Sequence, residues 1–139
     1  MSETAKVLYT GRTRTTGGRE NGAARSSDGR LDVRLSTPGS ARIGTNPEQL
    51  LAAGWSACLE SAIALAARKR EIVLPEAVSI DAEVDLHVAD GGSFISARFN
   101  ISMPCVERGV ARALVDAAHE NCPYSKATRG NVEVAINLV

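Results

Sequence analysis

Two stretches of regular alternation between apolar and polar residues dominate the second half of the chain. Every second residue is apolar from Val78 to Val88 and again from Ile95 to Met103, with Asp90-Gly91-Gly92 between them. Period-two alternation is typical of strands with one buried face, and a short glycine-containing connection is typical of a hairpin. The pattern predicts a long β-hairpin.

Shorter strand patterns lie at both ends of the chain. Residues 6–15 and 31–35 carry strand signals, with turns at Asn21-Gly22 and Asp28-Gly29, and residues 132–138 alternate again. The first part is predicted to be a small antiparallel meander with Gly17-Gly18-Arg19 in or beside one of its loops. The last part is predicted to be a final strand.

Two segments carry helix signals. Asn46-Pro47-Glu48-Gln49 combines an N-cap residue with proline at the first helical position, and residues 50–67 are apolar on nearly all sides before Pro75 closes the segment. Pro104 opens a second helix with one apolar face, which must end before Pro123. The prediction is one α+β domain over residues 1–139, with two main helices against a largely antiparallel sheet.

The first helix leads to a prediction about assembly. A helix that is apolar all round needs cover on several sides, and one sheet with one further helix covers only part of it. We therefore expect a homodimer with intertwined chains.

Composition limits the classes of function. The 139 residues are 44% hydrophobic, and 16 Lys and Arg balance 16 Asp and Glu, so no positive field attracts nucleic acid or anionic lipid. The sequence from Met1 to Lys6 leads into polar residues, and no apolar run reaches the ~20 residues needed to cross a bilayer. We expect a cytoplasmic protein with neither nucleic acid nor a membrane as partner.

The three cysteines, Cys58, Cys105 and Cys122, are the first indication of chemistry, because structural disulfides are rare in a reducing compartment. Cys58 lies inside the apolar helix, where a cysteine is most often a small buried hydrophobe. Pro123 forces Cys122 into an extended conformation just past the second helix, as suits either a mobile resolving thiol or an incidental loop cysteine.

His119 and Cys122 form a His-x-x-Cys pair, but no second pair of ligands at metal spacing accompanies it. The sequence therefore predicts no metal site. His119 is interpreted as a cation at the C-terminal end of its helix, where the helix dipole favours positive charge.

Five segments, taken together and in order, resemble the organic hydroperoxide resistance proteins, within the larger family that includes the osmotically inducible peroxidases. They are Thr16-Gly17-Gly18-Arg19-Glu20, residues 27–33, residues 45–50, Ser56-Ala57-Cys58, and residues 122–131 from Cys-Pro-Tyr-Ser onward. The resemblance implies a thiol peroxidase in which Cys58 attacks the peroxide and Cys122 resolves the product. It also implies that Arg19 and Glu48 activate Cys58.

The implied reaction needs no bound cofactor. Cys58 reduces an organic hydroperoxide and becomes a sulfenic acid, Cys122 closes a disulfide with it, and an external dithiol, implied to be a lipoylated protein, reduces that disulfide. Trp55 and Leu59 are expected to line an apolar substrate pocket, and Cys105 is expected to be a bystander. The alternatives are a peroxidase of the osmotically inducible branch, a redox sensor without turnover, and a binder of apolar ligands.

The spacing of Glu48 and Cys58 adds a structural expectation. On one straight helix, ten residues separate the two side chains by ~15 Å along the axis and about 80° around it. One guanidinium does not bridge that distance. A break or sharp kink near Ala53-Gly54 is therefore predicted, which would bring Cys58 into the first turn of a new helix.

Overall fold

The hairpin expected from the alternation forms the centre of the main sheet in the structure, a computed structural model that describes residues 5–75 and 77–139. Strands β4 (Ser79–Ala89) and β5 (Gly92–Ser102) pair antiparallel, from Ser79 opposite Ser102 to Ala89 opposite Gly92. The final strand β6 (Glu133–Leu138) pairs with β5 in parallel. The sheet order is β4-β5-β6, so the predicted hairpin and last strand are confirmed.

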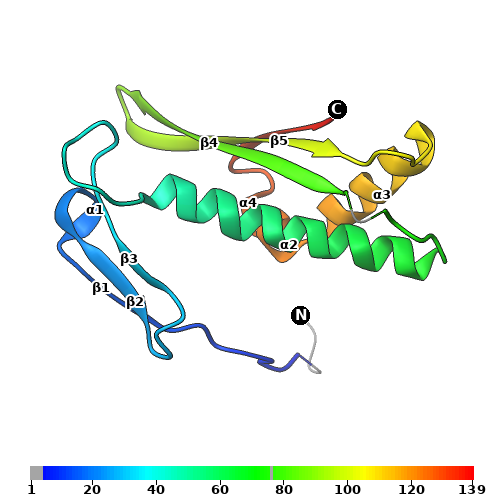
Figure 1. Ribbon diagram of the computed structural model, residues 1–139. Helices are drawn as coiled ribbons and strands as arrows, with labels where there is room; N and C mark the ends of the chain where they lie inside the picture. The colour runs from blue at the N-terminus through cyan, green and yellow to red at the C-terminus, as the bar shows by residue number, and fades with distance from the viewer. Residues whose placement is uncertain (1–4, 76) are drawn as a thin grey trace. The chain divides into compact units, whose positions relative to one another are not determined.

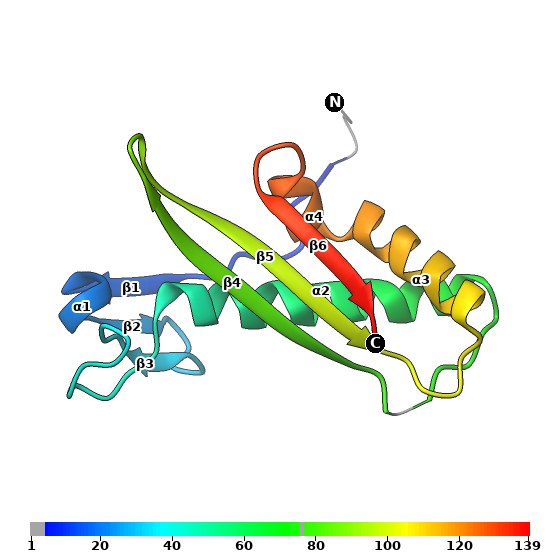
Figure 2. The same ribbon diagram turned by 90° about the horizontal axis from the view of Figure 1, so that it is seen from above.

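Three helices pack against this sheet: α2 (Pro47–Lys69), α3 (Arg108–Asn121) and α4 (Pro123–Thr128). The strands cross over α2, and α3 and α4 follow each other along the side of that helix (Figures 1 and 2). Trp55 and Leu59 of α2, Phe99 of β5 and Leu114 of α3 are completely buried. The Trp55 and Phe99 rings meet edge to face, with centroids 4.8 Å apart, so the core joins sheet and helices at this point.

The expected break in the first helix is absent, because α2 runs without interruption from Pro47 to Lys69. Glycine stands at position 54 for a different reason. A Cβ atom there would lie 3.3 Å from the hydroxyl oxygen of Tyr124. The missing side chain thus allows Tyr124 to approach α2 closely, and the prediction of a kink near Ala53-Gly54 is wrong.

The chain divides into two compact units, one ending at Pro47 and the other running from Glu48 to Val139. The first contains β1 (Thr13–Thr16), α1 (Gly18–Asn21), β2 (Ala23–Ser26) and β3 (Asp32–Arg34), and its strands pair antiparallel in that order. The predicted meander is confirmed, although residues 6–12 lie outside its strands. Arg19 lies in the short helix α1, which the sequence pattern did not predict, since Gly17 and Gly18 both have positive φ.

The predicted second helix begins later than expected. Glu107 is its N-cap, and the Glu107 carboxylate accepts hydrogen bonds of 2.9 Å and 3.1 Å from the N–H groups of Gly109 and Val110. Cys105 therefore lies in the turn before α3, with φ of 67°, and not at the start of a helix. Pro123 ends α3 as predicted, but it also opens α4, which the sequence analysis missed.

By length and composition, α2 is able to cross a membrane, with a mean hydropathy of 1.6 over an 18-residue window. The central helix of a water-soluble protein passes the same test, and α2 contributes five buried residues to the core. Only 28% of that window is buried within the single chain. Much of the surface of this apolar helix is therefore not buried within the single chain.

Candidate active site

Cys58 and Cys122 are separated by more than sixty residues of sequence, and the fold brings their side chains together. Cys58 lies on α2, half-buried, and Cys122 is fully buried between α3 and α4. A hydrogen bond joins the two thiols, and both are in the free, reduced form. The sequence therefore identified two residues that share one site.

The backbone at Cys122 has the extended conformation predicted from Pro123, with φ of −61° and ψ of 125°. Cys122 is nevertheless fixed on both sides by helices, because its N–H donates to the carbonyl of Ala118 and its own carbonyl accepts from the N–H of Lys126. The expected mobile hinge is a buried, hydrogen-bonded junction.

Burial is the main influence on the charge of Cys58. It raises the pKa of the Cys58 thiol, and the hydrogen bond and charge of Cys122 raise it further. A hydrogen bond from the backbone of Tyr124 acts in the opposite direction and stabilises the thiolate. A cation near Cys58 is needed to make the thiolate abundant at neutral pH.

A pocket of about 680 Å³ opens beside Cys58. The walls near the thiol are apolar and come mainly from α2, with Lys69 and Arg70 at the end of that helix; the residues along the walls include Ala62, Leu65, Ala66, Ala117 and Pro123. Trp55 and Leu59 do not line it, since both side chains are 0% exposed. This placement corrects the expectation that they form the substrate pocket: they belong to the core behind it.

Ser125 and His119 form a polar cluster that the sequence analysis did not assign to the site. The indole N–H of Trp55 donates to the Ser125 hydroxyl oxygen over 3.2 Å, and Nδ1 of His119 lies 2.9 Å from the same oxygen. Burial and the charge of Arg129 lower the pKa of His119. His119 is therefore neutral at neutral pH, and not the helix-end cation expected from the sequence.

The remaining predicted residues, Arg19 and Glu48, lie in different units. Arg19 belongs to α1 in the first unit, and Glu48 lies in the first turn of α2. Because α2 is continuous, Glu48 and Cys58 of one chain are ~15 Å apart along its axis. The meeting of Arg19 and Glu48 beside Cys58 stays a prediction.

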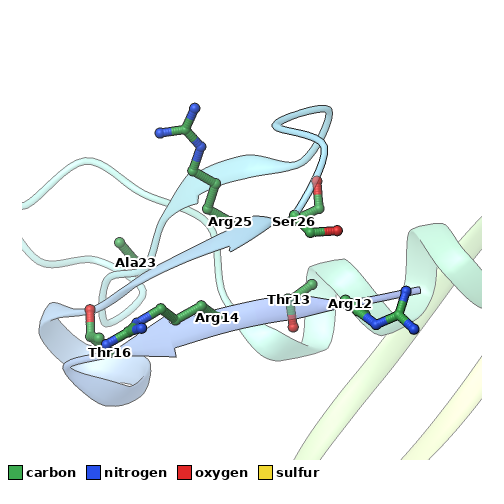
Figure 3. A pocket seen from close by; sticks show the side chains of 8 residues that line it. Arg12, Thr13, Arg14, Thr16, Ala23, Arg25 and Ser26 are labelled. Atoms are coloured by element: carbon green, nitrogen blue, oxygen red, sulfur yellow. The ribbon is translucent and has the colours of Figure 1, made fainter. Parts of the chain in front are cut away.

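The first unit has a hollow of its own, of about 560 Å³, on the β1–β2 hairpin. Arg12, just before β1, Arg14 of β1 and Arg25 of β2 line it, and the Arg25 side chain extends away from its strand (Figure 3). Arg14 stands directly opposite Arg25 in the strand register. This surface carries positive charge but no cysteine.

With this geometry established, comparison with known proteins identifies the family. The family model described as OsmC-like protein matches residues 36–137. An organic hydroperoxide resistance protein of Xanthomonas axonopodis pv. citri is 46% identical over 142 residues, which cover 99% of each chain.

The chain belongs to the OsmC/Ohr family. The crystal structure of the organic hydroperoxide resistance protein OhrB of Bacillus subtilis superposes with a TM-score of 0.89 at 40% identity, covering 96% of this chain and 100% of that one. An organic hydroperoxide resistance protein from Legionella pneumophila has the same TM-score at 42% identity, covering 96% and 98%. The α+β fold is thus that of the Ohr proteins, as the sequence motifs indicated, and a role in resistance to organic hydroperoxides follows from the family.

Proposed function

We propose that this Ohr-family protein is a thiol peroxidase that reduces organic hydroperoxides to alcohols. The observation that carries the proposal is the contact between Cys58 and Cys122, two reduced thiols joined by a hydrogen bond beside a largely apolar pocket. Two adjacent cysteines and an alkyl-sized cavity suit a two-step thiol cycle.

In the first step the Cys58 thiolate attacks one oxygen of the O–O bond. The bond breaks, the alkoxide leaves and takes up a proton to become the alcohol, and Cys58 becomes a sulfenic acid. In the second step the Cys122 sulfur attacks the Cys58 sulfur, a disulfide forms, and water leaves. An external dithiol then reduces the disulfide and is itself oxidised to a disulfide.

The residues around Cys58 fit a substrate with an apolar group. Ala62, Leu65 and Ala66 line the pocket and would remove the alkyl group of an organic hydroperoxide from water. Hydrogen peroxide has no alkyl group and gains nothing from this burial. We propose a lipoylated protein as the dithiol reductant, no bound cofactor, and a cytoplasmic site of action, where free thiols persist.

Activation of Cys58 is assigned to Arg19 and Glu48. Arginine stays charged at physiological pH, and its planar fork can hold a thiolate and a carboxylate together. The uninterrupted α2 keeps a chain's own Glu48 ~15 Å from its Cys58. In the proposed homodimer, the glutamate at each Cys58 is therefore Glu48 of the partner subunit.

Sustained turnover is the test. With dihydrolipoamide as reductant, the protein should consume cumene hydroperoxide over many cycles, and Cys58→Ser should lower the rate by two orders of magnitude or more, on the order of the loss of a nucleophile. Cys105→Ser is the matched control and should keep the activity. After one equivalent of peroxide, peptide mapping should find Cys58 joined to Cys122.

Three results distinguish the alternatives. A single round of oxidation without turnover indicates a redox sensor, and reversible binding of the hydroperoxide without consumption indicates a binder of apolar ligands. A Cys58–Cys105 disulfide overturns the assignment of Cys122 as the resolving thiol.

A further inference from the structure

The buried hydroxyl of Ser125 links three helices next to the pair of cysteines. Ser125 lies on α4 and is 0% exposed. Its oxygen accepts a hydrogen bond of 3.2 Å from Nε1 of Trp55 on α2 and lies 2.9 Å from Nδ1 of His119 on α3. A buried serine with partners on two other helices fixes the position of its own segment.

The three groups form a continuous chain of hydrogen bonds when His119 is neutral. Trp55 can only donate, so the Ser125 oxygen accepts from it and the hydroxyl hydrogen is free to point to His119. Nδ1 of His119 accepts that hydrogen when the ring is neutral and carries its proton on Nε2. Burial and the nearby Arg129 favour that neutral ring, against the smaller influence of Asp116.

Two members of this cluster are close in sequence to the two thiols, Trp55 to Cys58 and Ser125 to Cys122. Trp55 precedes Cys58 by three residues on α2, so the two side chains lie on one face of that helix. Ser125 follows Cys122 by three residues, and between them the backbone of Tyr124 bonds to Cys58. The segment from Cys122 to Ser125 is thus attached to α2 at adjacent points.

We propose that Ser125 is a positioning residue for disulfide formation, holding Cys122 against Cys58 through its bonds to Trp55 and His119. The inference rests on the proposed peroxidase function. In the step it affects, the Cys122 sulfur attacks the Cys58 sulfenic acid, the S–S bond forms, the S–O bond breaks, and the hydroxyl leaves as water with the Cys122 proton. A disulfide needs Cα atoms within about 4.4–6.8 Å, so a small displacement of Cys122 slows this step. Ser125 bonds to Trp55 and His119 and not to Cys58, so we expect its loss to change the reaction of Cys58 with peroxide much less than the formation of the disulfide.

The test separates the two steps in the full-length protein. Ser125→Ala is treated with one equivalent of cumene hydroperoxide, and samples quenched over time are analysed by mass spectrometry for the Cys58 sulfenic acid and for the disulfide. Sulfenic acid should form within about twofold of the wild-type rate, and the disulfide should form about tenfold more slowly, as expected for a misplaced reacting group. Excess peroxide should then convert more Cys58 to sulfinic acid than in the wild type.

Ser56→Ala is the matched control, because the Ser56 hydroxyl bonds to the Ala52 carbonyl within α2 and not to the Cys122 segment. Trp55→Phe keeps an aromatic ring in the core but removes the N–H, and should slow the same step. It replaces Ser125→Ala if that variant does not fold. If folded Ser125→Ala, or Trp55→Phe in its place, forms the disulfide as fast as Ser56→Ala, the proposal is overturned.

A second measurement is independent of peroxide. In a glutathione redox buffer, the ratio of the Cys58–Cys122 disulfide to the dithiol reports how well the two thiols are placed. The ratio should be about tenfold lower in Ser125→Ala than in Ser56→Ala, because Cys122 is no longer held against Cys58. An unchanged ratio overturns the positioning role, whereas wild-type protein that forms this disulfide in the buffer but does not react with peroxide overturns the proposed function alone.

Discussion

At the scale of single residues, burial and charge act on Cys58 in opposite directions. Burial and the neighbouring Cys122 raise the pKa of its thiol, and the backbone of Tyr124 lowers it. The thiolate is the form that attacks a peroxide. A permanent cation such as Arg19 would lower the pKa of Cys58 and restore the thiolate. The proposed function therefore needs a residue from the first unit.

Replacing Arg19 with glutamine should therefore make Cys58 less reactive at neutral pH. We expect the pH midpoint for alkylation of Cys58 by iodoacetamide to rise by about one unit or more, since a cation beside an acid lowers its pKa by that order. The Cys58 peptide is followed by mass spectrometry. Arg14→Gln, a change to an exposed arginine of the same unit, should leave the midpoint in place. Equal midpoints for both variants would exclude Arg19 as the activating cation.

His119 makes stability depend on pH. Its pKa in the folded protein is lowered from the ordinary 6.5, so the unfolded chain binds more protons in the interval just below 6.5. The stabilisation is complete above pH 6.5 and is lost as the pH falls through the lowered value. Urea unfolding should show the free energy of unfolding decreasing from pH 6.5 toward pH 5, and the decrease should be smaller in His119→Asn. Identical slopes for the two proteins would contradict this account.

At the scale of elements, α2 owes its role to its continuity. Gly54 is a poor helix former, yet α2 passes through it, and Tyr124 of α4 packs against the space where a side chain would be. The same α4 segment carries the backbone bond to Cys58. A helix-weakening glycine is thus retained at a helix–helix contact next to the reactive thiol.

A large side chain at position 54 should disturb the site without breaking the helix. Gly54→Leu improves helix propensity by up to ~1 kcal/mol but displaces Tyr124, so we expect peroxide to oxidise Cys58 roughly tenfold more slowly while helical circular dichroism is kept. The Cβ of Gly54→Ala requires only a small shift of Tyr124, so the rate of Cys58 oxidation in this variant should lie between those of the wild type and Gly54→Leu. Wild-type rates in Gly54→Leu would show that the Tyr124 contact does not position Cys58.

At the scale of the whole molecule, α2 leaves an apolar surface uncovered in the single chain. Ala53, Ala57 and Ala64 are exposed along it, and Leu65 is 40% exposed. Small side chains allow another helix to approach closely. This surface supports the proposed homodimer, for which light scattering should give about twice the 14.6 kDa of one chain.

Mixing two inactive variants tests whether each site is shared between subunits. If Glu48 acts on Cys58 of the partner subunit, co-refolded Cys58→Ser and Glu48→Gln chains form mixed dimers with one intact site. Random pairing then restores about a quarter of the wild-type activity. No recovery in mixed dimers, verified by native mass spectrometry, would place both residues in one subunit or exclude the role of Glu48.

The sequence by itself determined what local rules and short motifs encode. Alternation specified the β4–β5 hairpin and β6, proline and capping residues specified where α2 begins and α3 ends, and five ordered motifs identified the family. Only the tertiary structure decided that Trp55 and Leu59 are core residues and that Ser125 joins three helices. The continuity of α2 through Gly54 also belongs to this second group, since Tyr124 lies seventy residues further along the chain. These features depend on contacts between distant segments, and no local periodicity or propensity encodes which distant residue fills a given space.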